Sequence, residues 1–346
     1  MKILFPFKKE LNPYLDEIIN YSIHTYVYDN YINYNPSYDI VHIHWPEAIF
    51  EWEEPTSDEL DDLERNINYW KQKSVIIYTK HDYQRNKGTT LNFTRLFELI
   101  EKNTDVFIHL GKFSQIFYQH KYPSVRHEII YHPLYTKCFS PLDKEVARKN
   151  LQIAEDAFVI IVPGNVRNYA ERDLMLNAFE SINFNKKVLI CINMYAELRY
   201  EFPGRTKLKS IIDIKKILIN RFKQNHKPPE FLFTYGTQSN IELEIKMSVS
   251  DLVFIPRIHT LNSGMFFLGL TFNKIVVGPS IGNIEEQLIE LELPAFNPKN
   301  KLSVSNALKK GMELSIDHKN YPDGLLKKYI PKAVAQQMDD LINDLC

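Results

Sequence analysis

The sequence DLVFIPRIHTLNSGMFFLGLTFNKIVVGPSIGNIEE, residues 251–286, decides the fold of this 346-residue chain. Its apolar residues 252–255 predict a strand that leads into a polar segment. The turn at residues 262–264 is expected to open an apolar helix over residues 265–272. A second apolar strand, over residues 275–277, ends in Gly-Pro-Ser, and another helix begins soon afterwards. This order of strand, loop, helix and strand is typical of a parallel sheet.

The turn at Asn262, Ser263 and Gly264 is the first candidate for a binding site. Ligands of parallel sheets bind at the carboxyl edge of the strands, where helices begin. The free amides and the dipole of a helix start favour a phosphate or diphosphate group. The alternative is that Asn262 and Ser263 only cap the helix and that Gly264 eases the turn.

Strands and helices also alternate outside this stretch, which predicts an α/β fold. The strands expected in the first part of the chain are residues 2–7, 38–44, 75–79, 106–110 and 128–131. After a pause over residues 136–156, strands are expected at residues 158–162, 187–193 and 230–235, with a long helix over residues 207–224. We therefore predict two doubly wound, Rossmann-like domains, residues 1–140 and 155–325. A final amphipathic helix, residues 332–346, is expected to pack back on the first domain.

Composition narrows the classes of protein to consider. The 42 Lys and Arg residues nearly balance the 43 Asp and Glu residues, so no overall charge points to nucleic acid or to an acidic membrane. No apolar run reaches the ~20 residues of a membrane span. Three widely spaced cysteines form neither a disulfide framework nor a metal site, and the N-terminus is expected to be a buried strand rather than a signal peptide. These features favour a cytoplasmic protein.

Four segments resemble one known family. Residues 253–286 resemble the donor-binding segment of bacterial sugar transferases with the GT-B fold, which carries a Ser-Gly turn, an apolar helix, a strand and Gly-x-x-x-Glu in this order. VPGNVRNY, residues 162–169, is similar to the Gly-x-x-Arg-x-Tyr turn of that family. DIVHIHWPE, residues 39–47, and IIYTKHD, residues 76–82, match the ends of two first-domain strands, although the family usually has Asn where this chain has Asp82. The resemblance spans about residues 1–290.

The resemblance implies a GT-B architecture, in which two Rossmann-like domains face each other across a cleft. It also implies a glycosyltransferase that moves a sugar from a nucleotide-sugar donor, bound by the second domain, to an acceptor bound by the first. The acceptor would be a saccharide or a polyprenyl-linked saccharide of bacterial polysaccharide or glycoconjugate synthesis. Neither a metal nor another cofactor is expected.

The second domain carries the candidate donor-binding residues. The leaving diphosphate gains charge in such a transfer, so fixed cations and amides aimed at it stabilise the transition state. Arg167, in a turn directly after a strand, is the first candidate cation, and Arg257 is the second. Gly164, Asn165 and the turn at residues 262–264 would supply the surrounding backbone. By resemblance, Glu286 would approach a hydroxyl of the ribose or the sugar.

The first domain carries the candidate catalytic residues. His44, His81 and Asp82 each stand where a strand ends, so we expect them to face the cleft. A His or Asp there could remove the proton from an acceptor hydroxyl in an inverting transfer. A retaining transfer needs no such base, and these residues would then position sugar and acceptor. His42 is expected to face the opposite side of the sheet from His44, as a packing residue.

Departures from the family keep other functions open. Ala170 stands where the family usually has a phosphate-binding lysine, and Thr260 and Leu268 stand where many retaining relatives have glutamates. The chain could therefore be a catalytically inactive partner subunit, or another nucleotide-sugar enzyme such as an epimerase or a phosphorylase. Residues 110–126 mix basic and aromatic side chains, which favours either a peripheral contact with the inner face of a membrane or an ordinary amphipathic helix packed on the sheet.

Overall fold

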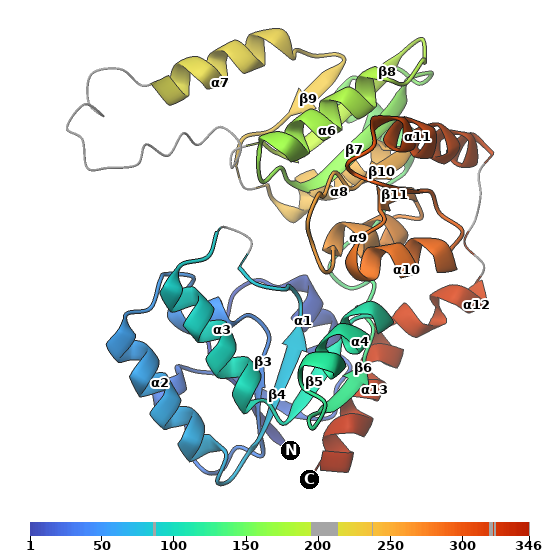
Figure 1. Ribbon diagram of the computed structural model, residues 1–346. Coiled ribbons are helices and arrows are strands. Elements are labelled where there is room, and N and C mark those ends of the chain that lie inside the picture. Colours follow the sequence, from blue (N-terminus) through green and yellow to red (C-terminus); the bar gives the residue numbers. More distant parts are fainter. Residues whose placement is uncertain (86–87, 195–213, 237, 318–320, 322, 346) are drawn as a thin grey trace.

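Two parallel sheets build the molecule (Figure 1). The computed structural model describes residues 1–85, 88–194, 214–236, 238–317, 321 and 323–345. Within these residues each sheet has six strands, and helices flank both sheets. The α/β fold with two Rossmann-like domains, predicted from the sequence, is confirmed.

The first sheet has the strand order β2-β1-β3-β4-β5-β6. Its strands are β1 (Lys2–Phe5), β2 (Thr25–Tyr28), β3 (Ile40–Ile43), β4 (Val75–Lys80), β5 (Val106–His109) and β6 (Arg126–Ile129). The helices that accompany it are α1 (Pro13–Ile19), α2 (Ser57–Trp70), α3 (Leu91–Asn103) and α4 (Lys112–Lys121). The order of the strands reverses between β1 and β3, which makes this pair the switch point of the sheet.

The second sheet has the order β12-β11-β10-β7-β8-β9, with its switch point between β7 and β10. Its strands are β7 (Phe158–Asn165), β8 (Lys187–Asn193), β9 (Phe231–Phe233), β10 (Leu252–Phe254), β11 (Ile275–Pro279) and β12 (Ala295–Phe296). The helices that accompany it are α5 (Lys144–Leu151), α6 (Tyr169–Glu180), α7 (Ile214–Asn225), α8 (Asn240–Val249), α9 (Gly264–Thr271), α10 (Gly282–Glu290) and α11 (Lys301–Ile316).

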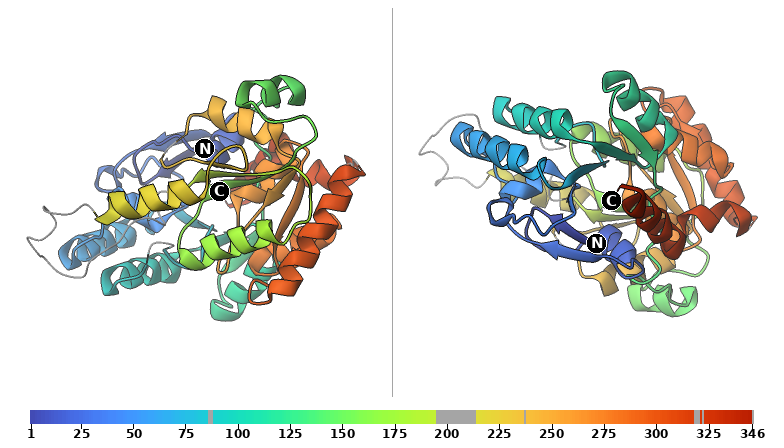
Figure 2. Two further views of the ribbon diagram at one scale, coloured as in Figure 1. Left: turned by 90° about the horizontal axis from the view of Figure 1, so that it is seen from above. Right: turned by 90° about the horizontal axis from the view of Figure 1, so that it is seen from below.

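The chain crosses back to the first domain at its C-terminal end. After α12 (Asp323–Leu326), helix α13 (Pro331–Leu345) runs beside the first domain, close to the N-terminus (Figure 2). Val334, Met338 and Ile342 on one face of α13 join the core formed by Ile3 and Ile77 of the first sheet. Helix α13, the last helix of the chain, therefore covers one face of the first sheet.

Five of the described helices and strands are not among those that the sequence predicts, and two of them, α11 and α12, lie between the last expected strand and the final helix. Strands β2 and β12 lie at sheet edges and are short, and α5 falls within the pause at residues 136–156. Edge strands carry a weaker apolar pattern because they are only partly covered, and β2 has no fully buried residue. The helix expected over residues 207–224 is described as α7 from Ile214 onward; residues 207–213 lie outside the described part of the chain.

Candidate functional site

Arg167 and Arg257 lie on the two sides of the switch point of the second sheet. Strand β7 ends at Asn165 and is followed by Arg167, and β10 ends at Phe254 and is followed by Arg257. Because β7 and β10 are neighbours, their following loops meet at the carboxyl edge of the sheet. The structure thus brings together the two arginines that stand far apart in the sequence.

One carboxylate connects these two arginines. An oxygen of Glu171, in the first turn of α6, accepts hydrogen bonds from the Arg167 backbone amide at 2.9 Å and from Arg257 Nη1 at 2.5 Å. Arg257 Nη1 also donates to the Asn165 carbonyl oxygen at 2.8 Å. The side chain of Glu171 is 1% exposed and that of Arg257 is 5% exposed. Sequence reasoning missed Glu171; its place four residues after Arg167, in the first turn of a helix, was the available signal.

A cavity of about 210 Å³ lies where the two domains meet beside this network. The residues that line it are Asp82, Tyr83, Gln84 and Arg85 of the first domain and Arg167, Asn168, Glu171, Ile258, His259, Thr260 and Leu261 of the second. Asp82 and Arg167, predicted from separate motifs, therefore border one space. Of the two positions where the family often has glutamates, Thr260 lines the cavity, whereas Leu268 is buried in the core of the second domain.

His44 and His81 lie behind Asp82 rather than on the cavity wall. Both side chains are buried, and His44 Nδ1 lies 3.0 Å from His81 Nε2. The ring of His81 stacks on Trp45 at a centroid distance of 4.3 Å. Of the three predicted catalytic residues, only the half-buried Asp82 borders the cavity.

The expectation that His42 faces away from His44 is wrong. The two rings are 4.1 Å apart, and His42 Nε2 lies 2.8 Å from Thr79 Oγ1. Side chains two residues apart on a strand point to the same face, so His42 and His44 share one side of the sheet. His42 is nevertheless buried, as a packing residue would be.

Burial keeps these imidazoles neutral at pH 7. Loss of contact with water lowers the pKa of His42 to about 3 and holds the pKa of His44 and His81 well below the usual range. The neighbouring imidazoles lower the pKa of His44 and His81 further. A neutral imidazole has one donor and one acceptor nitrogen, which suits the contact between His44 Nδ1 and His81 Nε2.

Asn262, a predicted donor-binding residue, bridges the two domains. Its side-chain amide donates to the His81 carbonyl oxygen at 2.7 Å, and its oxygen accepts from Asn283 Nδ2 at 2.7 Å. Its neighbour Ser263 is buried and caps α9 without a side-chain hydrogen bond, and a Cβ on Gly264 would lie 2.8 Å from the Tyr135 hydroxyl oxygen. The turn at residues 262–264 thus packs against the first domain.

Gly164 and Asn165 lie at the end of β7. A Cβ on Gly164 would lie 2.7 Å from the sulfur of Met265 and 3.5 Å from Arg257 Nη2, so glycine allows α9 and Arg257 to approach the strand. Asn165 is exposed, and its carbonyl oxygen accepts the hydrogen bond from Arg257. Gly164 and Asn165 therefore set the position of Arg257 beside the end of β7.

Glu286 caps a helix of the other domain. Its two carboxylate oxygens accept hydrogen bonds from the backbone amides of Lys112, at 2.7 Å, and Phe113, at 3.1 Å, at the start of α4. Asn283 accepts from the Ser114 amide at 2.9 Å. Gly111, the N-cap of α4, has no capping side chain, and a Cβ there would overlap Glu286. In this arrangement Glu286 serves the contact between the domains rather than the cavity.

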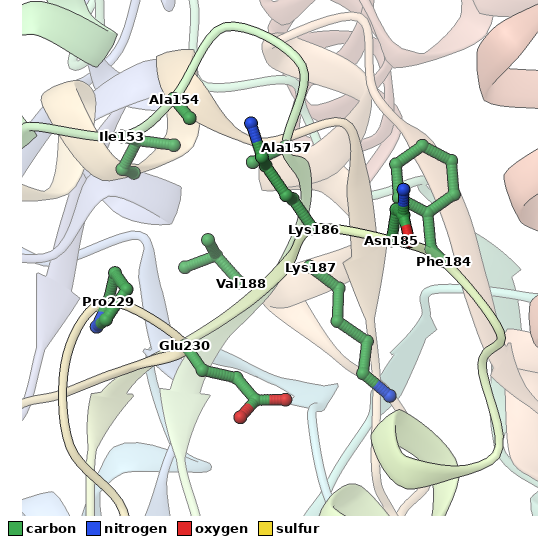
Figure 3. A pocket seen from close by; sticks show the side chains of 10 residues that line it. All are labelled: Ile153, Ala154, Ala157, Phe184, Asn185, Lys186, Lys187, Val188, Pro229 and Glu230. Atoms are coloured by element: carbon green, nitrogen blue, oxygen red, sulfur yellow. The ribbon is translucent and has the colours of Figure 1, made fainter.

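Other hollows lie on the second domain, among them one of about 560 Å³ between α6 and α11. A hollow of about 350 Å³ lies at the amino ends of β7, β8 and β9, the edge of the second sheet opposite the arginines (Figure 3). Of its two lysines, Lys186 pairs with Asp156 and Lys187 donates to the Phe179 and Ile182 carbonyl oxygens. Among the described residues, no three His, Cys, Asp or Glu side chains are placed to hold a metal ion, and no helix is long and apolar enough to cross a bilayer.

Comparison with solved structures gives the class of fold. The chain is similar to Anabaena HepE in complex with UDP-glucose, with a TM-score of 0.68 and 15% identity over 99% of this chain and 100% of that one. It is also similar to a glycosyltransferase from Rickettsia africae, with a TM-score of 0.65 and 11% identity over 99% and 98% of the two chains. For sucrose-phosphate synthase from Thermosynechococcus elongatus the TM-score is 0.62, with 14% identity over 89% of this chain and 74% of that one.

These similarities show that the chain has the GT-B fold, as the resemblance of its motifs implies. By sequence, no family model and no curated protein matches it. The assignment therefore rests on the arrangement of the two sheets over nearly the whole chain.

We expect Glu286→Ala to loosen the contact between the domains. The variant leaves the Lys112 and Phe113 amides without their acceptor, and loss of a helix cap costs about 0.5–2 kcal/mol. The midpoint of thermal unfolding should fall, and small-angle X-ray scattering should give a larger radius of gyration. Glu285→Ala, at the exposed neighbouring position, is the matched control. Equal scattering and melting of the two variants would show that Glu286 does not hold the domains together.

Proposed function

We propose that the chain is a glycosyltransferase of the hexosyltransferase type, which moves a sugar from a nucleotide-sugar donor to a saccharide or lipid-linked saccharide acceptor. The observation that carries the proposal is that Arg167 borders the cavity together with Asp82, while Arg257, bound to Glu171, lies at the same switch point of the second sheet. Two arginines at such an edge suit a diphosphate. Structural neighbours in complex with UDP-glucose and with UDP support a nucleotide-sugar donor.

In the proposed reaction, the second domain stabilises the leaving group. Arg167 and Arg257 neutralise the charge that the diphosphate gains as the glycosidic bond breaks, while Gly164 and Asn165 shape the wall beside them. Asp82 faces this space from the first domain, so it is placed to take the proton of an acceptor hydroxyl or to orient the sugar. His81 and His44, neutral and buried behind it, hold the strand end in place.

A second candidate function is a catalytically inactive partner subunit with the same fold. Two observations favour it. Ala170 stands in place of a phosphate-binding lysine, and the carboxylate of Glu286 is engaged by the start of α4 in the other domain. Under this alternative, the chain would bind or transfer no sugar nucleotide.

A thermal-shift screen separates these two functions. A ligand that binds the folded state raises the melting temperature by mass action. We expect one of the uridine, guanosine, cytidine or deoxythymidine diphosphates, or its sugar, to raise it by several degrees, and Arg167→Ala to lose that rise. Arg65→Ala, an exposed arginine of α2, is the control for charge. If no nucleotide raises the melting temperature of the native protein, the proposed donor site is absent and the chain is better explained as a partner subunit.

Turnover of the selected donor tests Asp82. We expect Asp82→Asn to lower kcat by about 100-fold if the group removes a proton, because positioned general bases contribute about 10²–10⁴-fold. Release of the nucleoside diphosphate, with and without added saccharide acceptors, gives the rate. Asp58→Asn, at an exposed residue in the first turn of α2, is the control. An unchanged kcat for Asp82→Asn would remove Asp82 from the catalytic residues.

Helix α4 is the face that we propose for a lipid-linked acceptor at the inner side of the membrane. It packs on the first domain through Ser114 and Tyr118, yet leaves Phe113, Ile116 and Phe117 exposed, with Ile116 at 67%. The helix carries Lys112 and no acidic residue, while Lys121 pairs with Glu101 at 2.7 Å, so its exposed face suits an anionic surface mainly through Lys112 and the apolar side chains. Tyr83 contacts Phe117 and lines the cavity, which connects this face to the site.

Vesicle flotation tests this face. We expect the protein to float with vesicles that contain phosphatidylglycerol, and the double variant Ile116→Ser, Phe117→Ser to bind at least about tenfold more weakly, because each fully buried apolar side chain contributes about 1.5–3 kcal/mol. Leu91→Ser, at an exposed leucine that begins α3, is the matched control. Equal flotation of the native protein and the double variant would exclude α4 as the contact.

A further inference from the structure

The buried carboxylate of Glu171 bonds the backbone amide of Arg167 and the guanidinium of Arg257, the two arginines of the candidate donor site. Its oxygen accepts from the Arg167 amide at 2.9 Å and from Arg257 Nη1 at 2.5 Å, and its residue borders the cavity. Its own amide donates to the N-cap Asn168 at 3.0 Å. The same residue therefore ties the turn after β7 to the loop after β10, on the two sides of the switch point.

The surroundings of Arg257 show why it needs this partner. Burial and the nearby charge of Arg167 lower the pKa of Arg257 to about 10, while Glu171 and Asp82 act in the opposite direction. Cys191 of β8 also lies within electrostatic reach of Arg257. Removing one partner of a buried ion pair leaves an uncompensated charge, which is strongly unfavourable. Glu171 thus compensates the buried charge of Arg257 beside Arg167.

The contacts also fix the orientation of the guanidinium. Nη1 is held by two acceptors, the Glu171 carboxylate and the Asn165 carbonyl oxygen. Nη2 lies on the side of Gly164, 3.5 Å from where a Cβ of that residue would be, in a space that Met265 also fills. A planar guanidinium with one nitrogen held by two acceptors has little rotational freedom, so less order is lost when an anion binds.

We propose that Glu171 is a positioning residue of the diphosphate site, which holds the Arg257 guanidinium in the geometry that binds the nucleotide. This inference rests on the proposed function, since it assumes that the two arginines bind a nucleoside diphosphate. It assigns to the first turn of α6 the orientation of a cation that comes from the loop after β10.

The test is a double-mutant cycle on the affinity for UDP, or for the diphosphate that the thermal-shift screen selects, measured by titration calorimetry. We expect Glu171→Gln to raise the Kd about tenfold or more, as is typical when a charge-assisted hydrogen bond is lost. With Arg257→Gln as the background, the same substitution should change the Kd by less than about twofold, because Arg257 is no longer there to be positioned. Asp173→Asn, an exposed acid of the same helix, should leave the Kd unchanged.

The outcomes separate this inference from the proposed function. An equal loss of affinity from Glu171→Gln in both backgrounds would mean that Glu171 only supports the fold of the turn, which overturns the positioning role. Native affinity in Glu171→Gln would overturn it too, while loss of binding in Arg167→Ala would leave the proposed function standing. If the native protein binds no nucleoside diphosphate, the proposed function itself fails. Thermal unfolding without nucleotide checks folding, and Glu171→Asp, which keeps the charge but shortens the reach, replaces Glu171→Gln if that variant does not fold.

Discussion

The capping of α4 by the second domain fixes how the two halves of this molecule face each other. A helix start leaves backbone amides that need acceptors, and Gly111 has no side chain to offer. Glu286 and Asn283 of α10 supply those acceptors from the other domain, and the bare Cα of Gly111 lets them approach. Asn262 extends the same contact to the end of β4. With the domains held in this way, Asp82 at the end of β4 lies opposite Arg167 at the end of β7.

The charged side chains around the cavity between the two domains determine which ligands it favours. Two arginines lie close together in a partly buried site, a costly arrangement unless carboxylates accompany them. Glu171 contacts Arg257 directly, and Asp82 lies across the cavity. On the first-domain side the histidines stay neutral because burial lowers their pKa, so they add no positive charge there. An incoming diphosphate would therefore meet Arg167 on the wall of the second domain and Arg85 on the wall of the first.

The sequence predicts the fold better than it predicts the partners of individual side chains. Alternation of apolar strands and helices indicates both domains, because strands buried on two faces read as continuous apolar runs. Edge strand β2, only partly covered, gives no such signal. Strand ends place Arg167 and Arg257 at one edge, since parallel topology brings carboxyl ends together. The contacts of Glu286 and Asn262 depend on how the domains dock, which no local pattern records. The prediction for His42 is wrong for a simpler reason. Side chains two residues apart on a strand point to the same face, so the strand pattern itself places His42 and His44 on one side of the sheet.

The size of the cavity connects the domain contact to binding. Pockets for small ligands usually measure about 300–1,000 Å³, whereas the space that the described residues line between the domains is about 210 Å³. If binding of a nucleotide sugar separates the domains to gain room, the bonds of Glu286 and Asn262 must open. Each such hydrogen bond contributes only about 0.5–1.5 kcal/mol net, since water replaces the partner. A contact made of a few of these bonds can hold the domains together without donor and still yield to the binding energy of a diphosphate on two arginines. By linkage, whatever strengthens the contact weakens donor binding to the same extent.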